Sequence, residues 1–160
     1  MSKDPQQALR QHVVRVLKSA DAHTSFDAAI ARLPVQKQGV RPNGAPHSAW
    51  DILEHLRIAQ WDILEFIRNP KHVSPKFPDG YWPTASYPEN EQSWTQAADA
   101  FRADLAAMVH LVEDEKTDLF APLPHGNGQT VLREALVLAD HNAYHLGQLV
   151  FLRRLLSAWP

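Results

Sequence analysis

The sequence predicts an all-α fold, a four-helix bundle, and three observations support this. Four segments, each roughly twenty to thirty residues long, carry apolar residues at helical spacing. Three of these segments open on capping-box sequences, which mark helix starts. No segment shows the strict alternation that is typical of strands. Because amphipathic helices bury their apolar stripes against each other, we expect the four to pack as one domain over residues 1–160.

The composition excludes several classes of protein. The chain is 44% hydrophobic and 21% charged, which is typical of a globular protein. Its net charge is −2, and its longest basic run is Arg153-Arg154, so we expect no nucleic-acid partner. There is no cysteine, which excludes thiolate nucleophiles and disulfides. The chain shows no signal peptide and no membrane-spanning run, so we expect a soluble cytoplasmic protein without a membrane partner.

The first helix is predicted to begin after Asp4, with Pro5 in its first turn, and to continue to Leu33. Pro34 ends it, because the proline ring and the missing N–H cannot continue the helical hydrogen bonds. Residues 35–47 are rich in proline, glycine and asparagine. We expect them to form a connection that runs along the bundle.

The second helix is predicted to start at Ser48, where Asp51 completes a capping box, and to stop at Asn69-Pro70. His55 borders its apolar stripe. A lone histidine there is more often a hydrogen-bonded core residue than a metal ligand. Asp51 lies one turn before His55 on the same face and is therefore a candidate to orient its ring.

Residues 71–92 are predicted to form a long ordered coil between the second and third helices. Four prolines oppose a helix, whereas four aromatic residues oppose disorder. Loops of this length are usually lids or binding walls, which makes Tyr81 and Trp82 candidates for substrate contacts. The alternative is a structural cover that seals the core at the opposite end.

The third helix is predicted to begin at Ser93 and to fade through the acidic residues 113–115, since these charges oppose the helix dipole. A loop over residues 118–129 follows. The fourth helix is predicted to span residues 130–159 and to carry two apolar rows about 100° apart. Either this helix is deeply embedded, or its second row packs on another subunit. We expect a homodimer with these residues near the contact: Leu132, Leu136, Leu146 and Val150.

Two histidines of the fourth helix, His141 and His145, lie four residues apart. On a helix this spacing places both imidazoles on one face, where both can reach one metal ion. His55 supplies a third imidazole from another helix of the bundle. Three neutral nitrogen ligands leave a position for water or substrate, which is typical of a catalytic site. We therefore expect one divalent transition metal at these histidines, and imidazole suits nickel, zinc, iron and copper alike.

Two further residues of the fourth helix point toward the same side. Gln148 lies one turn beyond His145, and Glu134 lies two turns before His141. Both are candidates for contacts with the ligands or with a substrate, although a surface position for Glu134 is an equal alternative. The sequence lacks the Glu of a His-Glu-x-x-His motif, which excludes zincin protease chemistry.

Three motifs together resemble one family. They are Glu54-His55-Leu56 in a helix that opens near Trp50, the run Asp-His-Asn-Ala-Tyr-His-Leu-Gly-Gln at 140–148, and Leu-Arg-Arg at 152–154. This pattern resembles the DinB superfamily (DinB/YfiT-like proteins) over essentially the whole chain. The resemblance implies an up-down-down-up bundle, a divalent metal held by three histidines at His55, His141 and His145, and frequent dimers.

The resemblance does not supply a reaction, so three functions are open. The first is a metal-dependent enzyme that acts on a small molecule, either a hydrolase or a thiol-dependent transferase, since a bound metal generates a nucleophile at neutral pH. The second is a non-catalytic metal-binding or stress-associated protein in which the ion fastens the bundle. The third is a small-molecule binding protein whose histidines are only polar core groups.

Overall fold

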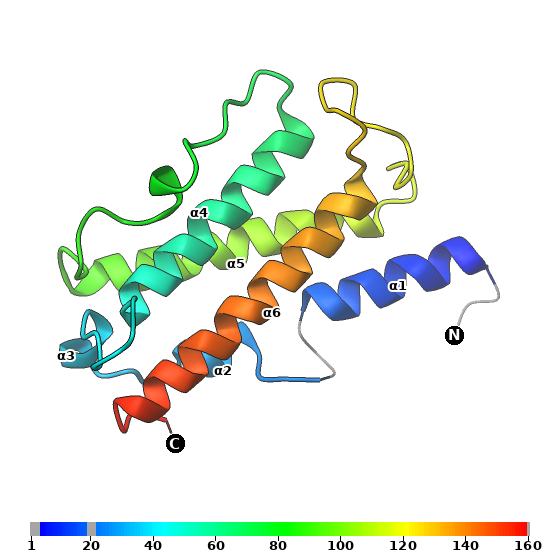
Figure 1. Ribbon diagram of the computed structural model, residues 1–160. Helices are drawn as coiled ribbons and strands as arrows, with labels where there is room; N and C mark the ends of the chain where they lie inside the picture. The colour runs from blue at the N-terminus through cyan, green and yellow to red at the C-terminus, as the bar shows by residue number, and fades with distance from the viewer. Residues whose placement is uncertain (1–3, 19–21, 160) are drawn as a thin grey trace.

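The prediction of an all-α fold is confirmed. A computed structural model describes residues 4–18 and 22–159 (Figure 1). The described residues form six α-helices and one turn of 3-10 helix, with no β-strand. In chain order these elements are α1 (Pro5–Leu17), α2 (Phe26–Ile30), α3 (Val35–Gln38), α4 (Ala49–Arg68), η1 (Asp79–Tyr81), α5 (Glu91–Glu113) and α6 (Val131–Leu155).

The four long helices pack against each other, with α4 and α1 each in contact with both α5 and α6. The arrangement places α4 directly beside α6 (Figure 1). None of the described helices is both long enough and apolar enough to cross a membrane.

The predicted first helix is wrong beyond its first half. It ends at Leu17. Residues 26–30 of the predicted helix form the separate short helix α2, and the predicted connection begins with the short helix α3. The side chain of Ser25 accepts a hydrogen bond from the backbone N–H of Ala28, and serine favours such N-cap positions over helix interiors. Arg32, with φ of 55°, then turns the chain before Pro34.

The other helix starts follow their capping chemistry. Ser48 and Asp51 form the predicted capping box of α4. The third helix, however, begins at Glu91 rather than Ser93, because Asn90 is its N-cap and Ser93 is the reciprocal partner of that cap. Helix α6 starts after Thr130 as predicted but ends at Leu155, four residues before the predicted end.

The apolar core consists of two clusters along the bundle. One cluster joins α2 to the first halves of α4 and α5 and the last turns of α6, and the other joins α1 to the opposite ends of the same three helices. Between the two clusters α4 and α6 carry buried polar residues. Among them, Asn142 donates to the Gln60 side chain (3.0 Å), and Gln60 donates to the carbonyl of Phe101 (2.6 Å). A polar layer therefore crosses the middle of the core.

The second apolar row of α6 is partly internal. Leu146 is only 1% exposed and belongs to the core, so its predicted place at a subunit contact is wrong. Leu132 and Val150 are half-buried against the core clusters. The apolar side chains of α6 that face solvent are instead Leu136, Val137, Tyr144, Phe151 and Leu155.

A buried arginine fixes the C-terminal end of α6. Arg153 is 1% exposed, and its guanidinium donates to the carbonyls of Ala29 (2.5 Å), Ala31 (2.8 Å) and Ala158 (2.7 Å). These carbonyls lie at the end of α2 and in the segment after α6. The arginine thus supplies hydrogen bonds that these helix ends cannot make internally.

Candidate metal centre

Three histidines meet where α4 lies against α6. The Nε2 atom of His55 lies 3.0 Å from Nε2 of His145 and 3.0 Å from Nε2 of His141. His55 and His145 are buried, and His141 is half-buried. The three potential ligand atoms all lie within 4.8 Å of one another. The structure therefore brings together the three histidines that the sequence singled out.

Hydrogen bonds on the outer side of two rings determine which nitrogen faces the centre. The Nδ1–H of His55 donates to the backbone carbonyl of Tyr81 (2.8 Å), and the Nδ1–H of His145 donates to Oε1 of Gln148 (2.8 Å). A neutral imidazole carries a hydrogen on only one of its two nitrogens. The Nε2 atoms of His55 and His145 therefore each present a lone pair to the other. In this arrangement of hydrogens the 3.0 Å contact between them contains no hydrogen, and a cation between the nitrogens makes it favourable.

The pKa values of the three rings keep them neutral at physiological pH. Burial, followed by the neighbouring His55, lowers the pKa of His141 to about 4. Burial, followed by the neighbouring His141 and His55, lowers the pKa of His145 to about 4. Burial also lowers the pKa of His55, opposed by its hydrogen bond to the Tyr81 carbonyl. Neutral imidazole is the form that binds metals.

Two of the three separations between the ligand nitrogens match those around a single ion. With metal–nitrogen bonds of about 2.05 Å, two ligating nitrogens lie about 2.9 Å apart at a right angle and about 3.3 Å apart in a tetrahedron. The observed separations of 3.0 Å from His55 to the other two rings lie within this range. Neutral nitrogen donors without a thiolate or carboxylate suit nickel, zinc and iron. Three such donors leave room for a further ligand.

Two polar atoms beside the site have no hydrogen-bond partner among the described residues. Nδ1 of His141 is buried without a hydrogen bond, and so is Oδ1 of the adjacent Asn142. His141 therefore lacks the outer hydrogen bond that fixes the other two rings. We infer that its orientation depends more on packing than theirs does.

Trp82 of the coil packs on the histidine cluster. Its ring stacks on the ring of His55, with centroids 4.0 Å apart and planes 5° apart. The other face of Trp82 stacks on His47, with centroids 3.8 Å apart. The edge of the same indole faces His145 at 6.2 Å. The coil thus covers the candidate site with an aromatic layer, rather than the opposite end of the core.

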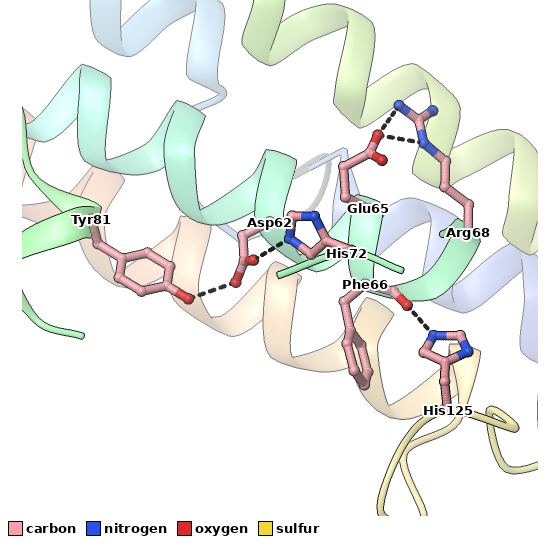
Figure 2. A network of polar contacts seen from close by, with 7 residues as sticks. All are labelled: Asp62, Glu65, Phe66, Arg68, His72, Tyr81 and His125. Atoms are coloured by element: carbon pink, nitrogen blue, oxygen red, sulfur yellow. Dashed lines mark hydrogen bonds and ion pairs between the residues drawn. The ribbon is translucent and has the colours of Figure 1, made fainter. Parts of the chain in front are cut away.

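A buried carboxylate holds the coil in this position. Asp62 of α4 accepts hydrogen bonds from the Tyr81 hydroxyl (2.6 Å) and from Nε2–H of His72 (2.7 Å), as Figure 2 shows. The same Tyr81 offers its backbone carbonyl to His55. Burial, followed by the hydrogen bond to Asp62, raises the pKa of Tyr81 to about 12. Asp62 therefore fixes the residue whose carbonyl orients a potential metal ligand.

Figure 2 also shows two neighbouring contacts that do not reach the three histidines. Glu65 pairs with Arg68 one turn later on α4, and His125 contacts the carbonyl of Phe66 (2.5 Å). The second contact joins the 118–129 loop to the end of α4. Within the described part of the chain neither contact includes His55, His141 or His145.

Two of the predicted supporting residues have other roles. Asp51 is buried, caps α4 at Ser48 and pairs with Arg41 (2.9 Å), so the prediction that it orients His55 is wrong. The Tyr81 carbonyl fills that role. Glu134 is 3% exposed, which excludes the surface alternative. Its carboxylate accepts from Arg133 (2.6 Å), and within the described part of the chain it has no bond to the three histidines.

The sequence analysis missed three residues that the structure places around the site. Asp62 follows His55 by seven residues, two helical turns, so helical spacing alone places it on the same face. His47 and His72 lie in irregular segments, where no periodicity relates them to a helix face. Only the tertiary contacts identify them.

Comparison with known proteins gives one match. The family model described as the DinB superfamily matches residues 20–149, which include all three histidines of the candidate centre. Neither the curated proteins nor the solved structures contain a match.

Removing the Tyr81 hydroxyl tests the anchor of the coil. Tyr81→Phe leaves one oxygen of the buried Asp62 without a partner, so we expect the free energy of unfolding to fall by about 1–2 kcal/mol. We also expect faster amide hydrogen exchange at Tyr81 and Trp82, because the coil is released from α4. Tyr87→Phe removes the same atom from an exposed tyrosine and is the control. Equal effects of both substitutions would contradict the anchoring role.

The lowered pKa values predict a pH dependence for the metal-free protein. Between pH 6.5, the ordinary histidine value, and pH 4, the unfolded chain binds protons at His141 and His145 that the folded chain does not. Above pH 6.5 these two rings therefore do not change the free energy of unfolding. Below it the free energy of unfolding falls as the pH drops toward 4, by at most about 1.4 kcal/mol per pH unit for each ring. Urea unfolding at several pH values measures this slope. The dependence of the free energy of unfolding on pH should become weaker in a His141→Gln/His145→Gln variant and stay the same in His12→Gln. An unchanged dependence in the double variant would exclude this explanation.

Proposed function

The chain belongs to the DinB superfamily, and we propose that it is a metal-dependent enzyme acting on a small molecule. One divalent transition-metal ion, nickel, zinc or iron, is held by His55, His141 and His145. The reaction is either hydrolysis or transfer to a low-molecular-weight thiol. The observation that carries this proposal is the 3.0 Å approach of the Nε2 atoms of His55 and His145, whose Nδ1 atoms both contact an oxygen on the outer side.

The surrounding residues support a reactive site rather than a purely structural one. The Tyr81 carbonyl and Gln148 hold two rings with their lone pairs inward before any ion binds. Trp82 limits water on one side of His55. A bound divalent cation supplies Lewis-acid chemistry, which makes water or a thiol nucleophilic at neutral pH. Three donors from the chain leave the exchangeable position that such chemistry needs.

The proposal includes a specific architecture. We propose that the chain forms one up-down-down-up bundle of α1, α4, α5 and α6. The blue-to-red order of these helices in Figure 1 supports this, since α4 and α5 run in one direction while α1 and α6 run in the other. In that arrangement His55 and the pair on α6 approach from antiparallel neighbours. The three ligands then come from only two helices.

Metal content tests the ligand set directly. We expect protein prepared without added metal to contain one transition-metal ion per chain by elemental analysis. His55→Ala, His141→Ala and His145→Ala should each remove most of it, because two remaining imidazoles bind far more weakly. His110→Ala removes an exposed histidine of α5 and should leave the content unchanged. Unchanged stoichiometry in His55→Ala or His141→Ala would show that the ligand assignment is wrong.

A second measurement separates an enzyme from a non-catalytic metal protein. We expect the metal-loaded protein to accelerate either hydrolysis of p-nitrophenyl butyrate or conjugation of a thiol to 1-chloro-2,4-dinitrobenzene. Chelation and His141→Ala should each abolish that rate. If chelation lowers the unfolding temperature but neither reaction depends on the metal, the ion only stabilises the bundle.

We further propose that the chain forms a homodimer through the outer face of α6. Five large apolar side chains of this helix face solvent, and three of them, at positions 136, 137 and 144, lie within about two helical turns of one another. Gly147 lies among them, and a Cβ there would meet no atom within 4 Å, so a partner can approach closely. We place the contact at Leu136, Val137 and Tyr144, which are 37–64% exposed, and Phe151 and Leu155 continue the exposed row toward the end of the helix.

Charged substitutions on this face test the dimer. Leu136→Glu/Val137→Glu should shift the protein from dimer to monomer in sedimentation at micromolar concentration, because each buried carboxylate in the interface would lack a partner. The exposed Val16→Glu on α1 is the control and should leave the dimer intact. A wild-type protein that sediments as a monomer at this concentration would exclude the interface.

A further inference from the structure

A cavity lies beside the histidine cluster, between the connection before α4 and the last turns of α6. We propose that it binds an uncharged small molecule with an apolar body, whose polar end lies between His47 and Gln148. The cavity has a volume of about 450 Å³, which is within the range of small-molecule sites. That this molecule is the substrate rests on the proposed function. Binding of the molecule in the cavity does not depend on the proposed function.

The walls of the cavity are mostly apolar. Residues 43–47 form one wall, and Gly44, with φ of 82°, allows this segment to turn there. Ile52 of α4 also lines the cavity. Helix α6 forms the opposite wall with Phe151, Leu152 and Leu155. Phe151 and Leu155 are 64% and 50% exposed, so they leave apolar surface for a ligand to cover.

The polar groups of the cavity define the chemical class of the ligand. Its ten lining residues include no lysine, arginine, aspartate or glutamate. An ionised ligand would therefore lose hydration without gaining a counter-charge, which disfavours it. The side chains that can form hydrogen bonds are Asn43, His47 and Gln148. An amide, ester, alcohol or thiol with a hydrocarbon body satisfies both conditions.

Two of these polar residues connect the cavity to the histidine cluster. Gln148 lines the cavity and also accepts from Nδ1–H of His145 (2.8 Å). His47 lines the cavity and stacks on Trp82, whose other face stacks on His55. One side chain, Gln148, separates the cavity from His145, and two, His47 and Trp82, separate it from His55. The polar end of a bound molecule at these two residues is therefore the end nearest the candidate metal.

Octanamide and octanoate test the binding site, because they share a hydrocarbon chain and differ in charge. We expect octanamide to bind the metal-free protein saturably, with methyl NMR shifts at Ile52, Leu152 and Leu155. Octanoate should bind about tenfold more weakly, since the cavity offers no cation. Leu155→Ala should weaken octanamide binding about threefold or more by removing apolar contact. Leu136→Ala is the matched control, a leucine of the same helix with 48% exposure outside the cavity.

Three outcomes overturn the binding site. They are no saturable binding of octanamide, equal binding of octanoate, and equal effects of the two leucine substitutions. The same titration on Leu136→Glu/Val137→Glu addresses a second copy of the chain as the occupant. If octanamide binds only to this variant, and not to the wild type, the partner subunit fills the cavity and the proposal fails. Equal binding to both proteins supports a small-molecule site.

Hydroxamic acids test whether the cavity serves the metal site. In the metal-loaded protein, octanohydroxamic acid should bind at least about tenfold more tightly than acetohydroxamic acid, because its chain reaches the cavity. Leu155→Ala should reduce this difference. If octanamide binds but chain length does not affect hydroxamate affinity, the cavity is not the substrate site. If octanamide binds but the wild-type protein takes up no metal, the proposed function fails and the binding site stands.

Discussion

Two buried nitrogen lone pairs that face each other at 3.0 Å repel unless a positive charge lies between them, and the residues around His55 and His145 hold two nitrogens at this distance. The Tyr81 carbonyl and Gln148 each bind the outer nitrogen of a ring, which forces the inner nitrogen to carry the lone pair. Burial lowers the histidine pKa values and thereby removes the protons that would relieve the repulsion. The site is thus preorganised for a cation. In the metal-free protein the free energy of unfolding falls as the pH falls, because the unfolded chain binds protons that the folded chain does not.

The coil between α4 and α5 is part of this arrangement rather than a simple connection. Two of its side chains, Tyr81 and His72, donate hydrogen bonds to Asp62, a buried carboxylate two turns beyond His55 on the same helix. Its aromatic contact goes to His55 itself, through Trp82. Because one element both orients a ring and covers it, the substitution of Tyr81 affects the position of His55 as well as the fold. The coil therefore contributes both to the stability of the fold and to the orientation of a potential metal ligand.

Helix α6 contributes three different surfaces, which explains its unusual apolar content. One face packs into both core clusters, and His141 and His145 interrupt it at the polar layer between them. A second face lines the cavity beside Gln148. A third face exposes large apolar residues such as Leu136 and Tyr144 to solvent. A single apolar stripe could not serve all three surfaces, so the helix carries apolar residues around much of its circumference.

The sequence by itself determined the helices whose signals are local, and it singled out the histidines. Capping chemistry placed the start of α4, and spacing four apart put His141 and His145 on one face of α6. Local signals failed where two of them competed: the cap at Ser25 interrupts the predicted first helix, and Asn90 starts α5 before Ser93. Only the tertiary structure decided which groups surround the histidines. His47 and the Tyr81 carbonyl reach them through irregular segments, and the positions of such segments follow from long-range packing that no residue period encodes.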